Sequence, residues 1–286
     1  MRGDCVHHIG VGDVFVIAGQ SNSAGYGKDY ISDCLDAGVH LLKNNGKWDM
    51  AAHPMNDSTG TIHPQNRDGA NTGHGMYLSF AKYLKRELGY PIGLVQASLG
   101  GSPLKAWSAE DGYLYRSMIH IVRGLNGIKG ILWYQGCSDT SPEDSRTYEE
   151  RFEKMVRDVR RTLNMDTLPF LTCQINRVMT RCDEETIRGW GRVREAQRRA
   201  AQKIQNVFII PTWGGGRKLI PISAKVVDRN VVELKFQEEL PRVCTLHGAY
   251  EADLPYPPVT DGGSRLPMLS FYEVEVEEKR VETGMS

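Results

Sequence analysis

Apolar residues along the chain gather in five short runs that have the character of buried β-strands. The runs are VFVIA (14–18), IGLVQAS (92–98), GILWYQG (130–136), LPFLTCQI (168–175) and NVFIIPT (206–212). Near-continuous β-branched and aromatic residues, without alternation, are typical of strands covered on both faces. The pattern therefore predicts a sheet that is packed on both sides.

Four segments between these runs place apolar residues at helical spacing. They are 76–89, 114–125, 145–163 and 191–204, and the first ends at Gly89, a residue type that often follows the last turn of a helix. Strands that alternate with helices favour an α/β fold with a parallel sheet. The stretch 19–75 after the first strand is expected to be long and irregular, and to form a binding wall beyond the strand ends.

The pattern changes after Thr212. A flexible joint, GGGRKLIP, leads into segments that alternate between apolar and polar residues, AKVVDRNVVELKF and LSFYEVEVEEKRVE. Alternation is typical of antiparallel strands with one solvated face. The sequence therefore predicts two parts, an α/β domain over 10–213 and a small β-rich appendage over 214–286.

Composition narrows the classes of partner and cofactor. The 286 residues contain 35 basic and 35 acidic side chains, so charge favours neither a nucleic-acid nor a membrane partner. No apolar run approaches the roughly 20 residues of a membrane span, and the first ten residues lack the core of a signal peptide. The chain as written is expected in the cytoplasm, or outside the cell if a leader has been clipped. The six scattered cysteines show no zinc-binding spacing, so no metal or cofactor is expected.

Three of the predicted strands end in glycine and polar residues. Ser21 follows the first strand and Gly19, in a position where its own N–H can stabilise an oxyanion, although serines there are often turn or capping residues. The second strand ends at Gly100-Gly101-Ser102, and the third runs into Gln135-Gly136-Cys137-Ser138-Asp139. Because carboxyl ends of neighbouring parallel strands meet, these clusters are expected to form one site.

Taken together, these blocks resemble a known family. Gln20-Ser21-Asn22 after an apolar strand, ASLGGS followed by Trp107, and LWYQG-x-SD are similar to the sialate O-acetylesterase and acetylxylan esterase branch (carbohydrate esterase family 6-like) of the SGNH hydrolases. The resemblance covers about 10–212. It implies a three-layer flavodoxin-like sheet and a cofactor-free enzyme that removes acetyl groups from sugars, acting on a small-molecule or oligosaccharide acetyl ester.

The resemblance also implies roles for individual residues. Ser21 corresponds to the nucleophile, in a block with Gln20 and Asn22 that contacts substrate or oxyanion. Gly100 or Gly101 corresponds to the second oxyanion N–H, and Gln135 to a side-chain donor. Trp107 and Trp133 are alternatives between a sugar-stacking face and core packing.

Two departures from the family pattern bear on activity. Cys137 stands where relatives commonly have a carboxylate, and an inert buried thiol is a better interpretation than a second nucleophile. Asp139 remains and is a candidate for part of the electrostatic role. The Asp-x-x-His block that follows the fifth strand in the family is not visible. Among the eight histidines His74 and His247 are the named candidates for a replacement base, and His53 and His63 in the long loop are further alternatives. The favoured interpretation is that none of them serves as the base.

Without a base, this copy is expected to be impaired, because loss of a triad member costs on the order of 10⁴–10⁶ in rate. Two alternatives to an active esterase follow from this gap. One is a pseudoenzyme that binds carbohydrate without turnover. The other is a truncated remnant with an exposed sheet edge. The sequence makes no prediction of oligomeric state.

Overall fold

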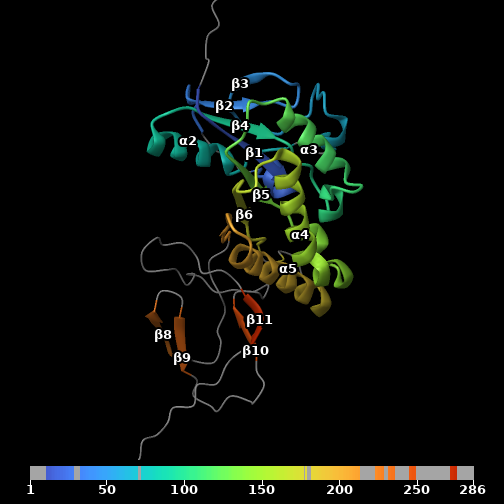
Figure 1. The fold of residues 1–286 in the computed structure, drawn as a ribbon, viewed down its shortest axis with the longest axis vertical. Helices are drawn as coiled ribbons and strands as arrows, with labels where there is room; N and C mark the ends of the chain where they lie inside the picture. The colour runs from blue at the N-terminus through green and yellow to red at the C-terminus, as the bar shows by residue number, and fades with distance from the viewer. Residues whose placement is uncertain are drawn as a thin grey trace, which may run out of the picture.

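A seven-stranded sheet forms the centre of the computed structural model, which describes residues 11–28, 33–69, 72–176, 178, 182–212 and four later strands. The strand order is β3-β2-β4-β1-β5-β6-β7. All neighbours pair in parallel except β2 and β3. The strands are β1 (Asp13–Gly19), β2 (Val39–Leu42), β3 (Trp48–Met50), β4 (Ile92–Gln96), β5 (Gly130–Tyr134), β6 (Phe170–Cys173) and β7 (Val207–Ile210) (Figure 1).

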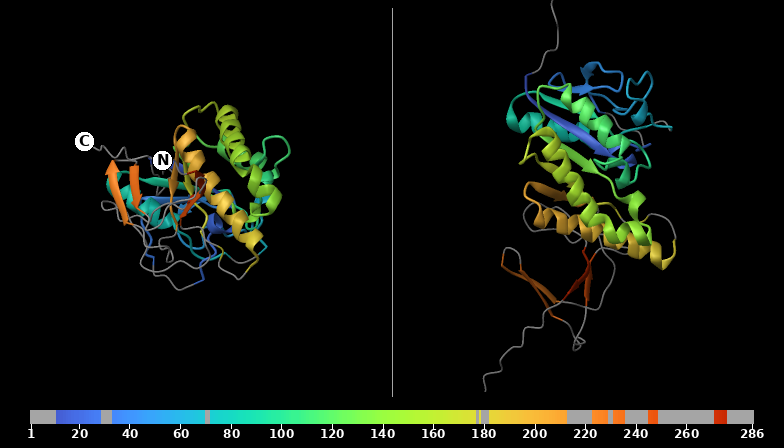
Figure 2. Two further views of the ribbon diagram at one scale, coloured as in Figure 1. Left: turned by 90° about the horizontal axis from the view of Figure 1, so that it is seen from below. Right: turned by 45° about the vertical axis from the view of Figure 1, so that its right-hand side comes forward.

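Helices cover both faces of this sheet (Figure 2). One face packs against α2 (Tyr77–Leu88), where Leu78 and Ala81 join a core with β1, β2 and β4. The other packs against α3 (Tyr113–Arg123), α4 (Pro142–Leu163) and α5 (Glu184–Lys203). Short helical turns complete this part: α1 (Ser21–Ala24), η1 (Pro64–Asn66), η2 (Leu104–Trp107) and η3 (Cys137–Asp139).

The predicted fold class is confirmed. The five strands expected from the sequence are β1, β4, β5, β6 and β7, and they lie side by side in the order second-first-third-fourth-fifth. That order is the flavodoxin-like one, in which ligands bind beyond the carboxyl ends of the strands next to the first strand. The topology therefore directs attention to the loops that follow β1, β4 and β5.

The long helices begin and end where side chains satisfy their terminal groups. The Ser141 hydroxyl accepts a hydrogen bond from the Asp144 N–H at the start of α4, and the Asp183 carboxylate accepts one from the Thr186 N–H at the start of α5. The prediction placed the start of α5 too late, at 191. Glu184 and Glu185 are polar but favourable in a first turn, so apolar spacing alone does not reveal them.

The stretch 19–75 is less irregular than predicted. It contains α1, η1 and the paired strands β2 and β3, which extend the sheet by two strands beyond β4. β2 is four residues long with alternating burial, and β3 is three residues long and largely exposed. Strands this short give too few positions for a pattern to be recognised.

Four strands of the C-terminal part are described by their backbone. β8 (Ser223–Asp228) pairs antiparallel with β9 (Val231–Lys235), and β10 (Thr245–Gly248) pairs antiparallel with β11 (Phe271–Glu275). The β character expected after residue 213 is thus confirmed, and the division at 213/214 into two domains stays a prediction. No helix in the described part of the chain is long and apolar enough to cross a membrane.

Candidate active site

The loops after β1, β4 and β5 meet at one edge of the sheet. β1 lies between β4 and β5, with Ile17 opposite Gln96 on one side and Gly19 opposite Tyr134 on the other. The residues that follow these strands are the three polar clusters singled out in the sequence. The parallel register brings them together, as the pattern predicted.

Gln20 and Ser138 join the three loops through hydrogen bonds. The buried Gln20 side-chain oxygen accepts from the N–H of Gly136 at 2.9 Å and of Ser138 at 3.3 Å, and its amide nitrogen donates to the Ser138 hydroxyl at 3.3 Å. The Ser138 hydroxyl in turn donates to the Gly101 carbonyl at 3.1 Å. Gln20 therefore fixes the position of the residue that follows it, Ser21, relative to the other two loops.

Ser21 is the first residue of α1 and is partly exposed. The N–H groups of Ser23 and Ala24 bond to the Gln20 carbonyl, whereas those of Ser21 and Asn22 have no partner among the described residues. The chain reaches this turn through Gly19, whose φ of +129° disfavours a side chain and where a Cβ would lie 2.4 Å from the Tyr134 carbonyl oxygen. The turn thus presents a hydroxyl beside free backbone donors.

The two glycines after β4 are not equivalent. The Gly100 N–H donates to the Asp68 carboxylate at 3.0 Å, so it is occupied. The Gly101 N–H has no partner in the described part of the chain, and its φ of +69° favours glycine. Of the two alternatives for a second oxyanion donor, the geometry leaves Gly101 available.

Gln135 and Asp139 form a buried cross-link instead of pointing to a free site. The Gln135 amide nitrogen donates to the Ser102 carbonyl at 3.2 Å and to Asp139 at 2.5 Å, and both side chains are fully buried. Both amide hydrogens are therefore engaged, which leaves none for the oxyanion role expected of Gln135. Asp139 also accepts from the Leu104 N–H at 2.8 Å and pairs with Arg151 at 3.1 Å.

Burial raises the pKa of the Asp139 carboxyl above its ordinary value, and the hydrogen bonds from Leu104 and Gln135 and the charge of Arg151 offset part of that rise. None of these partners is a histidine. The residue locks the loops after β4 and β5 to α4, which is a structural task and differs from the electrostatic role considered for it in the sequence.

Cys137 lies beside the turn of Ser21. The Asn22 amide approaches its sulfur at 3.8 Å. Burial raises the pKa of the thiol to about 12, with a smaller contribution from the charge of Asp139. The thiol therefore stays protonated near neutral pH, which agrees with the interpretation of an inert cysteine.

Both tryptophans considered for sugar stacking belong to the core. Trp107 and Trp133 are fully buried and contact each other edge to face, with ring centroids 5.1 Å apart. Neither offers a face to a ligand, so the stacking alternative is wrong for both.

The candidate bases lie in two places. His74 pairs through its backbone with Gly27, just beyond α1, and its ring packs close to Gly27. Its Nε2 is buried without a hydrogen-bond partner among the described residues. The centroids of the His53 and His74 rings lie 6.0 Å apart. His247 lies in β10, of which the backbone alone is described. Within the described residues, no histidine is hydrogen-bonded to the Ser21 hydroxyl.

Asp68 is the residue of this region that the sequence interpretation missed. Its carboxylate accepts from the Tyr26 hydroxyl, the Gly100 N–H and, at 3.3 Å, the Asn56 amide, so it ties the long loop to the loops after β1 and β4. Burial, with the neighbouring Asp68, raises the pKa of Tyr26 to about 12. An aspartate in the polar run NRDGANTG carries no motif signal, since polar loop residues are common.

Beside Asp68 lies a polar pocket of about 660 Å³, called here the loop pocket. Its lining residues are Pro54, Asn56, Asp57, Ser58, Thr59, Gly60, Arg67, Asp68, Gly69 and Thr72. In the part of the chain that the structure describes, no group of three histidine, cysteine or acidic side chains is placed to hold a metal ion.

Comparison with known proteins places this geometry in a family. Residues 11–218 match the family model of the carbohydrate esterase, sialic acid-specific acetylesterase. A probable carbohydrate esterase of Arabidopsis thaliana is 29% identical over 185 residues, covering 57% of this chain and 68% of the relative. The human (Homo sapiens) sialate O-acetylesterase is 30% identical over 125 residues, which cover 33% of this chain and 24% of that protein.

A solved structure supports the fold. The X-ray structure of an Arabidopsis thaliana protein superposes with a TM-score of 0.60 at 27% identity, over 72% of this chain and 87% of that one. The match to the human sialate O-acetylesterase spans about a quarter of that relative's length.

Proposed function

Because the chain belongs to the carbohydrate esterase, sialic acid-specific acetylesterase family, we propose that it removes acetyl groups from sugar hydroxyls through Ser21. The observation that carries the proposal is the set of hydrogen bonds by which Gln20 and Ser138 connect the loops after β1, β4 and β5. These bonds hold the loop of the partly exposed Ser21 to the loop of Gly101. Among the described residues the N–H groups of Ser21 and Gly101 have no hydrogen-bond partner, so both are candidates for the oxyanion donors that acyl transfer requires.

The proposed reaction has two steps. The Ser21 oxygen attacks the carbonyl carbon of the acetyl ester and loses its proton to a base, while the N–H groups of Ser21 and Gly101 hold the negative oxygen. The C–O bond to the sugar then breaks, and the sugar oxygen leaves with a proton returned by the base. Water attacks the acetyl-serine in the same way, which releases acetate and restores Ser21. A single oxyanion donor contributes about 3–4 kcal/mol to such barriers.

For the base, the proposal names His74 and His247. His74 lies next to α1 through its pairing with Gly27, and its Nε2 has no partner within the described residues. His247 lies in the C-terminal part, after the position beyond the fifth strand where the resemblance implies a histidine block. We expect slow turnover compared with an enzyme that has a complete triad, because no described histidine bonds to Ser21.

The test is hydrolysis of a chromogenic acetyl ester and of an acetylated sugar by the protein and its Ser21→Ala variant. We expect the variant to lose at least about 10³-fold in rate with both substrates. Ser108→Ala is a matched control, because Ser108 lies beyond η2 and its hydroxyl accepts from the Glu110 N–H. His74→Ala and His247→Ala then identify the base, which shows itself as a rate loss approaching that of Ser21→Ala.

Equal activity of the protein and its Ser21→Ala variant would overturn the proposal. Saturable binding of acetylated sugar by both proteins, without release of acetate, would then indicate a carbohydrate-binding protein without turnover.

A further inference from the structure

We propose that the loop pocket binds the sugar part of the substrate and selects uncharged sugars over acidic ones. This inference rests on the proposed function, because it names the substrate class of the same site. The pocket is lined by the loop between β3 and α2, in which the sequence shows no motif.

The loop pocket is connected to the loops around Ser21 through Asp68. Asp68 lines the loop pocket and also accepts the Gly100 N–H, one residue before the free N–H of Gly101. Its contact with Tyr26 reaches the other side, since Tyr26 follows α1 by two residues. One carboxylate thus belongs to the pocket and to both loops that flank Ser21. Asp68 thus connects the pocket to the loop that contains Gly101, one of the proposed oxyanion donors.

The lining of the loop pocket is chemically suited to a sugar. Most of the side chains are hydroxyl, amide or charged groups, and none of the described lining residues is aromatic. Such groups match the hydroxyls of a sugar, which donate to carboxylates and accept from amides. The volume of about 660 Å³ lies in the ordinary range of small-molecule sites, roughly 300–1,000 Å³.

The charged side chains of the loop pocket favour a neutral sugar. The loop pocket contains two carboxylates, Asp57 and Asp68, and one guanidinium, Arg67. A hydrogen bond from the Thr59 N–H lowers the pKa of Asp57, so this carboxylate is ionised near neutral pH. The charged lining is therefore net negative. A sugar with its own carboxylate would be repelled, whereas the hydroxyls of a neutral sugar can donate to the exposed Asp57 carboxylate.

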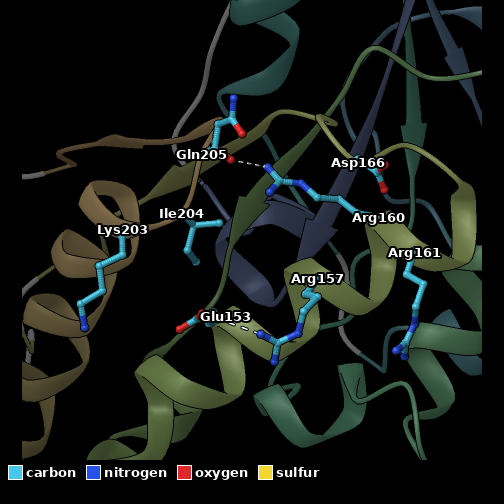
Figure 3. A pocket seen from close by; sticks show the side chains of 8 residues that line it. All are labelled: Glu153, Arg157, Arg160, Arg161, Asp166, Lys203, Ile204 and Gln205. Carbon is cyan, nitrogen blue, oxygen red and sulfur yellow. Dashed lines mark hydrogen bonds and ion pairs between the residues drawn. The ribbon is translucent and has the colours of Figure 1, made fainter.

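A pocket of the opposite charge lies elsewhere, at the ends of α4 and α5 (Figure 3). It is lined by Arg157, Arg160, Arg161 and Lys203 against Glu153 and Asp166. The Arg160 side chain donates to the Leu168 and Gln205 carbonyls, just before β6 and β7 begin. This basic pocket is thus at the amino-terminal edge of the sheet. It does not offset the negative charge of the loop pocket at the carboxyl edge.

The first experiment compares two natural classes of ester on the unaltered protein. We measure kcat/KM for an acetylated neutral sugar, such as acetylated xylose, and for an O-acetylated sialic acid at low and high NaCl. We expect at least about a tenfold preference for the neutral sugar at low salt. Salt should raise the value for the acidic sugar and leave the neutral one nearly constant, because it screens repulsion. Preference for the acidic sugar, or a fall of its kcat/KM with salt, would overturn the inference.

The second experiment removes one carboxylate from the pocket. Asp57→Asn keeps an oxygen that can accept from the Thr59 N–H, so the loop retains its turn. We expect kcat/KM for the neutral sugar ester to fall about tenfold relative to that for a small aryl acetate, and discrimination against the acidic sugar to shrink. Asp36→Asn is the matched control, since Asp36 pairs with Lys85 and neither side chain lines the loop pocket.

Different results would overturn the sugar assignment and the proposed function. Unchanged ratios in Asp57→Asn, in a protein that still depends on Ser21, would overturn the sugar assignment alone. Full activity of Ser21→Ala on every ester would overturn the proposed function itself.

Discussion

Strands β1 and β7 differ in how completely the described part of the protein covers them. β1 has neighbours on both edges and buries Val16, Ile17 and Ala18 completely. β7 pairs with β6 alone among the described strands, and it exposes 54% of Phe208 and 38% of Ile210. The loop after β1 is fixed by hydrogen bonds to two other loops.

The protein holds its backbone most firmly around β1. A nucleophile needs a fixed position relative to its oxyanion donors, and a strand enclosed on all sides provides it. The resemblance noted in the sequence implies a histidine block after the fifth strand, which is β7 here. Residues 213–222, which come shortly after β7, lie outside the described residues. We therefore expect substitutions near β1 to lower the free energy of unfolding far more than equivalent substitutions on β7.

The largest effect is expected from a methyl group at the end of β1. In Gly19→Ala the new Cβ would lie 2.4 Å from the Tyr134 carbonyl oxygen, at a φ of +129°. Backbone strain and overpacking together predict a loss of about 3 kcal/mol or more in the free energy of unfolding, measured by urea titration. Gly89→Ala is the control, because its φ is +76° and nothing lies within 4 Å of a Cβ there. Equal losses in the two variants would contradict the close packing inferred for β1.

The second effect compares side chains on the two strands. Ile17→Ala removes a fully buried side chain and should cost about 2–5 kcal/mol. Phe208→Ala removes a half-exposed one and should cost less than about 1 kcal/mol. Both values come from urea unfolding of the two variants beside the unaltered protein. A cost for Phe208 as large as that for Ile17 would show that another part of the chain covers β7.

Sequence patterns revealed the β1 half and left the rest hidden for physical reasons. Ser21, Gly101 and Ser138 fall in short segments directly after buried strands, and parallel pairing fixes where such segments meet. Asp68 acts across 32 residues of chain through a backbone N–H. A contact of that kind depends on how the long loop folds, and polarity alone does not predict it.

Gln135 shows the reverse case. Its place at the end of β5 suggested an oxyanion donor, and its burial instead engages it with Ser102 and Asp139. Strand position tells which end of the sheet a residue occupies. It does not tell whether the side chain turns into the protein or out of it, since that depends on the partners supplied by distant segments.

The third effect concerns catalysis. Asp68→Ala frees the Gly100 N–H and the Tyr26 hydroxyl, so the loop with Gly101 loses its tie to the long loop. We expect kcat for an aryl acetate to fall about tenfold or more, because misplacement of an oxyanion donor costs transition-state stabilisation. Asp68→Asn should recover part of the loss, as its oxygen still accepts from Gly100. Asp36→Ala, at a surface pair with Lys85, is the control. An unaltered kcat in Asp68→Ala would show that the β1 half is rigid without the long loop.

The smallest effect is expected from the thiol next to Ser21. With a pKa of about 12 for Cys137, about one thiol in 10⁴ is ionised at pH 8, and at pH values well below the pKa that fraction rises about tenfold for each unit by which the pH is increased. A thiol-alkylating reagent should therefore label the exposed Cys34 at pH 8 and leave both Cys137 and the esterase activity intact, as followed by mass spectrometry of peptides. The Cys137→Ala variant assigns any residual labelling. Rapid labelling of Cys137 with loss of activity at pH 8 would mean that the loops after β1 and β5 open to solvent, and the contrast between β1 and β7 would then hold for the strands but not for the loop that carries the nucleophile.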